Sequence, residues 1–464
     1  MSEKYVHDMT KGDEVSHIIR FTLPMLIGNI FQQFYNLIDA IVVGKYVGAN
    51  ALAAVGACAS LNFLFFSVCM GLSVGIGIII SQYFGAKKEE QVKRAIANST
   101  YVIGVSGIIM SILGAVFARQ VLQLLNTPPE VLEDSVSFLR IASGGMIAIA
   151  AYNAVAAILR ALGDSRTPLI FLVVSCAINV VLDLIFVLKF GLGVSGTASA
   201  TVISQACAAL GCVVFALLKN PYFKLKKKHW KISHSIIIKC IKIGVPVAAQ
   251  SSLIAVSLVA LQSVVNGFGE IAVAAYTATS RVEQLIQQPF NSLGAALSTF
   301  AGQNMGANEL DRVKKGYHKS ILIVAGFSFL ALLAAQFGGQ AIMEVFVKDE
   351  AVISLGERAI KITSYAYFPL GMIYITRGIL NGTGDAFYSM INGFVEVAGR
   401  VGFSGSLSMI PFLGVWSVWI TSGLTWTITA IASVIRYKQG KWQNKSLVKP
   451  AVKTIDYEKY IEEE

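Results

Sequence analysis

The chain is built almost entirely from apolar runs that follow one another from about residue 16 to about residue 436. Each run is about 20 residues or longer, the length of a helix that crosses the hydrocarbon core of a bilayer. Only 14% of the 464 residues are charged, against about 25% in a typical soluble domain. Since lipid offers no partners for the backbone, the runs must be helical. We predict an all-α membrane protein with twelve transmembrane helices, near 16–45, 50–82, 93–118, 132–158, 167–190, 195–218, 238–266, 271–301, 316–340, 355–380, 386–411 and 414–436.

The basic residues are distributed unevenly between the two sides of these spans. If the first residues lie inside, 29 of the 38 Lys and Arg fall in inner segments and four in outer loops. This bias predicts that both termini are cytoplasmic, in a multi-pass protein of the plasma membrane. It also accounts for the net charge of +11, so we expect no nucleic-acid partner.

The two halves of the chain resemble each other at a fixed offset of 221 residues. This offset predicts an N-terminal six-helix lobe (1–218), a basic cytoplasmic linker (219–237), a C-terminal six-helix lobe (238–436) and a cytoplasmic tail (437–464). An even number of spans in each half makes the lobes pseudo-symmetric about an axis along the membrane normal, as in transporters whose halves rock around a central site. The aligned pairs include Gly85 with Gly306, Ala86 with Ala307, Lys93 with Lys314, and Gly163 with Gly384.

Four polar side chains of the N-terminal half are predicted to lie at one depth. At about 1.5 Å per residue, Asp39 lies roughly 28 Å beyond Arg20 along the first span, and Asp183 reaches a similar depth in the fifth. Asn179 precedes Asp183 by one turn, and Thr201 lies at that level in the sixth span. Carboxylate, amide and hydroxyl oxygens suit Na⁺, and paired carboxylates in low dielectric hold a proton. Two structural alternatives stay open. Asp39 faces water in an open vestibule, or Asp183 caps a broken helix while Asn179 bonds only a neighbouring backbone.

The C-terminal half does not repeat this set. The offset places Ala260 opposite Asp39, Ser404 opposite Asp183, and Arg400 opposite Asn179. Glu396 and Arg400 are spaced to neutralise each other on one helix, which favours a structural pair. Glu283, near mid-membrane in the eighth span, is a candidate for attracting a cationic substrate.

The sequence offers no pattern for a metal or a bound cofactor. All five histidines fall at predicted cytoplasmic ends, and the six cysteines lack paired metal-ligand spacing. A membrane transferase would need paired Asp-rich motifs or an intramembrane histidine. We therefore expect no enzyme activity, no metal, and no cofactor beyond a coupling ion, H⁺ or Na⁺.

Several segments, taken in order along nearly the whole chain, resemble the multidrug and toxic compound extrusion (MATE) family, which belongs to a larger group with polysaccharide and lipid flippases. The resemblance implies two six-helix bundles around a V-shaped cavity, and export of bulky, often cationic organic molecules driven by inward H⁺ or Na⁺. The segments are Pro24, Asn36-Leu37-Ile38-Asp39 with Gly44, 51–56 (ALAAVG), Gly85-Ala86, 160–164 (RALGD) with Thr167-Pro168, and 179–183 (NVVLD).

The resemblance is strongest to the DNA-damage-inducible branch, in which the N-terminal lobe holds the cation. It implies a cation site at Asp39, Asn179, Asp183 and Thr201. The predicted substrate contacts are Tyr35, one turn before Asp39, together with Asn153 and Glu283. The partners are then a small amphipathic molecule and membrane lipid. Because one duplicated chain encloses the cavity, we expect a monomer.

A second transport function stays open at this point. A flippase for a lipid-linked or polysaccharide precursor would need a strongly cationic cavity to meet phosphates. The few arginines within the spans favour the drug exporter.

Overall fold

The computed structural model describes residues 6–448, and over this range it contains fourteen α-helices and no strand. The helices are α1 (Glu14–Val42), α2 (Ala49–Gly85), α3 (Glu89–Leu124), α4 (Pro129–Gly144), α5 (Met146–Ala161), α6 (Arg166–Leu184), α7 (Gly193–Lys219), α8 (His234–Asn266), α9 (Glu270–Gly306), α10 (Leu310–Glu344), α11 (Glu350–Ser364), α12 (Tyr367–Thr383), α13 (Ala386–Ser408) and α14 (Ser417–Lys438).

The all-α membrane fold predicted from the sequence is confirmed. Eight of the described helices are long and apolar enough to cross a membrane, and α4 with α5, bent by 43° where they join, makes a ninth span. The predicted spans 132–158 and 355–380 are wrong as single helices, because each is divided, at Gly145 and at Tyr365–Ala366 respectively. The count of twelve crossings stays a prediction, since α9 and α11–α13 do not pass this test of length and apolarity.

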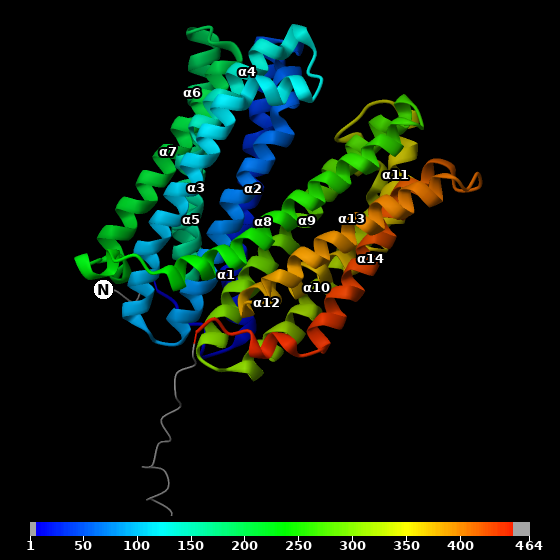
Figure 1. Ribbon diagram of the computed structural model, residues 1–464. Coiled ribbons are helices and arrows are strands. Elements are labelled where there is room, and N and C mark those ends of the chain that lie inside the picture. The colour runs from blue at the N-terminus through cyan, green and yellow to red at the C-terminus, as the bar shows by residue number, and fades with distance from the viewer. Residues whose placement is uncertain (1–5, 449–464) are drawn as a thin grey trace, which may run out of the picture.

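The helices form two bundles, α1–α7 and α8–α14 (Figure 1). The bundles lean apart toward the upper edge of the view and meet near its lower part, where both ends of the described chain also lie. Between the lobes, α2 packs along α8 and α9, and α1 packs on α9. The lobes meet at the end of the molecule that carries both chain ends, and we call this end the terminal side.

Glycines bring the two lobes into direct backbone contact on the terminal side. A Cβ atom added to Gly85 would lie 1.8 Å from the Gln303 carbonyl oxygen, and one added to Gly306 would lie 2.0 Å from the Gln82 carbonyl oxygen. Farther along α2, a Cβ atom on Gly71 would lie 2.6 Å from the Gly244 carbonyl oxygen of α8. Only glycine fits such a close approach of two helix backbones.

Two glutamines, one from each lobe, donate a hydrogen bond to a backbone carbonyl of the opposite lobe at this contact. Gln82 donates from Nε2 to the Gly382 carbonyl at 2.9 Å, and Gln303 donates to the Ala161 carbonyl at 3.0 Å. Donors and acceptors are both related by the 221-residue offset, so the two bonds are pseudo-symmetric. We call Gln82, Gly85, Gln303 and Gly306 the lobe clasp.

Both ends of the described chain close over the lobe clasp. The Oε1 atom of Gln303 accepts a bond from the Met9 backbone N–H, and the Oε1 atom of Gln82 accepts one from the Leu447 N–H, each at 2.8 Å. The N-terminal segment is held further by an ion pair between Asp8 and Lys87. Partial burial raises the pKa of the Asp8 carboxyl, but hydrogen bonds from Lys87 and Thr10 more than offset it, so the pKa lies below its usual value.

The basic linker between the lobes packs against α3 of the N-terminal lobe. His229 bonds Glu90 of α3 at 3.2 Å, and the Ser233 N–H donates to the Asn98 side chain at 2.8 Å. The connection between the lobes therefore packs on the N-terminal lobe.

We expect Gly85→Val to destabilise the protein by about 1–3 kcal/mol, the usual cost of overpacking. The added side chain would collide with the Gln303 carbonyl across the lobe clasp. The apparent melting temperature in detergent micelles should fall. The matched control is Gly104→Val in α3, where nothing lies within 4 Å of an added Cβ. Equal melting temperatures for the two variants would show that the lobes do not meet there.

Candidate functional site

The four predicted cation ligands come together in the N-terminal lobe from three helices. Asp39 lies near the end of α1, Asn179 and Asp183 lie in the last turns of α6, and Thr201 lies in α7. Packing of α6 against both α1 and α7 brings these helices side by side. Asp183 and Asn179 are 0% and 1% exposed, so this part of the site is removed from water.

Thr201 is the point at which the three helices are joined. Its Oγ1 atom receives a hydrogen bond from the Tyr35 hydroxyl at 3.2 Å and lies 3.5 Å from Asn179 Nδ2. The Thr201 hydroxyl itself donates to the Thr197 carbonyl at 3.0 Å. Tyr35, predicted as a substrate contact, is buried in this cluster and bonded to a predicted cation ligand.

The two carboxyl groups lie within hydrogen-bonding reach of each other. Neither of them offers a donor when ionised. Both oxygens of Asp183, Oδ1 of Asp39 and Oδ1 of Asn179 are buried without a donor among the described residues. Leaving such acceptors unsatisfied is costly. The arrangement therefore fits a shared proton or a small hard cation, which would supply the missing positive charge.

Both aspartates directly precede an irregular turn. A π-helical turn follows α1 over Val43–Val47, and another follows α6 over Ile185–Lys189. Such turns interrupt the regular ladder of helix hydrogen bonds and occur often at functional sites. Sequence reasoning missed both turns, because apolar periodicity does not register a single widened turn.

The other two predicted substrate contacts lie outside this cluster. Asn153 donates from Nδ2 to the Ile149 carbonyl of its own helix, α5, at 2.9 Å. Glu283 lies in the other lobe on α9, near Thr363 of α11 and Arg400. Among the described residues, neither contact joins these side chains to Asp39 or Asp183.

The C-terminal lobe has its own buried charged network. Glu396 bonds Arg400 at 3.1 Å, as predicted, and also lies 3.7 Å from Arg377 of α12. Arg400 additionally donates to the Ser257 hydroxyl of α8. Arg377 was not singled out from the sequence. The division of the tenth span at residues 365–366 sets α12 against α13, with Arg377 inside the lobe.

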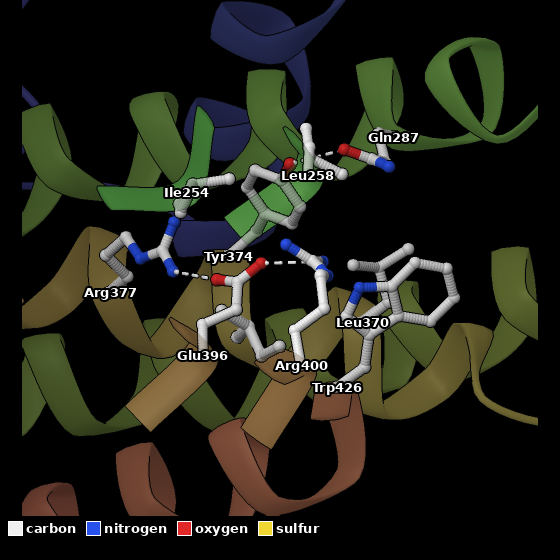
Figure 2. A pocket seen from close by; sticks show the side chains of 10 residues that line it. Ile254, Leu258, Gln287, Leu370, Tyr374, Arg377, Glu396, Arg400 and Trp426 are labelled. Atoms are coloured by element: carbon white, nitrogen blue, oxygen red, sulfur yellow. Dashed lines mark hydrogen bonds and ion pairs between the residues drawn. The ribbon is translucent and has the colours of Figure 1, made fainter. Parts of the chain in front are cut away.

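A cavity of about 70 Å³ adjoins this network. Figure 2 shows the Glu396 carboxylate between the two guanidinium groups. The Tyr374 hydroxyl, also in the wall, donates to Gln287 at 2.9 Å. The remaining lining residues are Ile254, Leu258, Leu370, Ile373 and Trp426.

Comparison with known proteins identifies the family. The MatE family model matches residues 24–185 and 246–400, one segment in each lobe. The chain belongs to the MatE family. The probable multidrug resistance protein YoeA of Bacillus subtilis is a relative, 30% identical over 440 residues that cover 92% of this chain and 94% of YoeA. The multidrug export protein MepA of Staphylococcus aureus is 24% identical, covering 86% and 88% of the two chains.

Solved structures of the MatE family share the fold. The outward-facing conformation of a multidrug resistance MATE family transporter of the MOP superfamily superposes with a TM-score of 0.88, at 23% sequence identity over 95% of this chain and 98% of that one. A MATE crystal structure in complex with MaL6 has a TM-score of 0.89. MatE family proteins are multi-pass membrane transporters of small molecules and not enzymes, as the sequence predicted.

We expect Asp183→Asn to raise stability by about 1–3 kcal/mol, because the amide would supply donors to acceptors that have none. The apparent melting temperature in detergent should rise above that of the parent protein. The exposed Asp134→Asn in α4 serves as the control and should leave it unchanged. A lower melting temperature for Asp183→Asn would mean that a shared proton or a bound cation already satisfies the two carboxyl groups of the parent protein.

Proposed function

We propose that this protein is a cation-coupled antiporter of the plasma membrane that exports bulky, often cationic organic molecules by alternating access. The observation that carries the proposal is the donor-free cluster of Asp39, Asp183 and Asn179. Such a cluster in the interior of a membrane protein is costly, and intramembrane carboxylates are functional candidates by default. Loading H⁺ or Na⁺ neutralises it, and releasing the ion restores the unfavourable state.

The cluster can couple ion binding to shape because it joins helices with different partners. Asp39 belongs to α1, which packs on α6 of its own lobe and on α9 of the other lobe. A change at the Asp39–Asp183 contact therefore shifts a helix that lies against both lobes. A ligand shifts the equilibrium between two conformations only to the extent that it binds one of them more tightly. A cation bound to the unsatisfied oxygens of Asp39 and Asp183 would do so wherever those oxygens lie close together.

The arrangement of the lobes supports alternating access. The lobe clasp closes the terminal side, while the bundles lean apart at the other end (Figure 1). The positive-inside bias of the sequence supports a cytoplasmic location for the terminal side, and with it an outward-facing state. Opening inward would break the two glutamine bonds, and rocking of the two repeats would expose the site to the other side.

A flippase for lipid-linked precursors stays the second candidate. Arg377 and Arg400 give the C-terminal lobe the positive charge that such a substrate would meet. However, Glu396 offsets part of it, and the cavity of about 70 Å³ is small. These features favour export of smaller amphipathic molecules.

Transport by reconstituted protein tests the proposal. In proteoliposomes, an imposed H⁺ or Na⁺ gradient should drive a fluorescent cationic dye against its concentration gradient. Imposing each ion gradient separately identifies the coupling ion. Asp39→Asn should abolish the uphill transport, because the amide no longer titrates and no longer offers a charge to Na⁺.

The exposed Asp134→Asn is the matched control, since it removes a carboxylate of the same lobe away from the cluster. Size-exclusion profiles should show both variants folded. Uphill transport by Asp39→Asn at the parent rate would remove this residue from the coupling mechanism.

A further inference from the structure

The buried polar centres of the two lobes have opposite chemistry at related positions. In the N-terminal lobe, Asn179 lies beside two carboxyl groups whose oxygens lack donors. The 221-residue offset places Arg400 at the equivalent position of the C-terminal lobe. There the network is rich in donors, with two guanidinium groups sharing the Glu396 carboxylate. The first centre is suited to a cation and the second to an anion.

One donor of the Arg377–Glu396–Arg400 network has no acceptor, and its guanidinium groups outnumber its carboxylate. Arg400 is 3% exposed, and its Nε atom is buried without an acceptor among the described residues. Arg377 is held by Gln250, whose side-chain oxygen, when oriented toward the guanidinium, accepts bonds of 2.5 to 2.8 Å. Within the cavity wall, two positive charges therefore face one negative charge. Buried charges that lack a full complement of partners are costly.

Glu283 is the other charged group near Arg400. It approaches from α9, near Thr363 of α11. It does not line the cavity. An ionised Glu283 lowers the positive charge that Arg400 contributes, but the Nε atom of Arg400 still has no acceptor among the described residues.

The size of the cavity limits what binds there. About 70 Å³ exceeds the roughly 30 Å³ share of one water molecule and falls well below the roughly 300 Å³ of a small-molecule pocket. A carboxylate group fits, whereas a whole drug molecule does not. Leu258 of the lining is 45% exposed, so the cavity reaches the surface at α8, a helix that packs against the other lobe. A molecule lying between the lobes can therefore insert an acidic group.

We propose that the cavity bounded by Arg377, Arg400, Tyr374 and Gln287 is a subsite for a small monoanionic group, namely the carboxylate of a transported molecule. Guanidinium groups bind carboxylates through paired, charge-assisted hydrogen bonds. Tyr374 and Gln287, bonded to each other across the wall, fix its polar edge, and Trp426 with the apolar lining accepts the adjoining carbon skeleton. This inference rests on the proposed export function and extends its substrates to zwitterionic and acidic compounds.

Binding of a matched pair of probes to the purified full-length protein tests the subsite. One probe is a zwitterionic rhodamine with a free carboxylate, and the other is its methyl ester. Fluorescence polarisation should show the free acid binding about tenfold more tightly than the ester, the effect of one charge-assisted hydrogen bond. Equal affinities in the parent protein would overturn the proposal without any variant.

Substitutions then test whether Arg400 is responsible for the tighter binding of the free acid. Arg400→Gln should bring the affinity for the free acid down to that for the ester and leave the ester unchanged, whereas Arg400→Lys should retain part of the preference. The control is Arg140→Gln, which removes an exposed arginine of α4 in the other lobe and should keep the full preference. If Arg400→Gln keeps it too, the acid binds elsewhere.

An inorganic anion such as chloride is the other ligand that this positively charged cavity could bind. Replacing methanesulfonate, which carries no carboxylate, by chloride at constant ionic strength should weaken binding of the acid and not of the ester. If chloride instead stabilises the parent protein while acid and ester bind equally, the cavity is an inorganic-anion site and the carboxylate subsite is wrong. Because these measurements use no ion gradient, their outcome is independent of the transport assay for Asp39.

Discussion

The tightest packing in this molecule is the backbone contact between its two lobes. Gly85 and Gly306 leave no room for a side chain where each helix meets the carbonyl of the other lobe, and Gln82 with Gln303 bonds across the same contact. Because duplicated positions make identical bonds, the lobes are joined by a pseudo-symmetric pair of interactions. A joint of this kind permits rocking in which both bonds break together. The packing of α2 on α8 and the outward divergence of the bundles both depend on it.

The two lobes share a duplicated helix arrangement, but the polar residues at their centres have diverged. The two lobes use the same helices in the same order, but the N-terminal centre holds acceptors without donors, whereas the guanidinium groups of the C-terminal Arg377–Glu396–Arg400 network outnumber its carboxylate. A pair of carboxyl groups can exchange a small cation, and a pair of guanidinium groups can hold an acidic group. Within one fold, the two sites can therefore bind different ligands without competing for them.

The sequence predicted the N-terminal cluster because its members are related by simple geometry. Depth follows from a fixed rise per residue, and Asn179 with Asp183 share a face one turn apart. Glu396 and Arg400 were paired for the same reason. Arg377, Gln250 and Gln287 were missed, because their contacts depend on where separate helices cross and on a break within a span. Asn153 and Glu283, predicted as substrate contacts, lie apart from the cluster.

The sequence by itself determined the membrane environment, the helical class, the duplication and the oxygen ligands at one depth. These properties reside in local composition, in periodicity and in a constant offset. Only the tertiary structure decided that the chain ends close over the lobe clasp, as in the bond between Met9 and Gln303, which are 294 residues apart, and that the guanidinium groups border a cavity. A helical pattern specifies the depth and face of a side chain, but the neighbour it meets depends on how the helices pack.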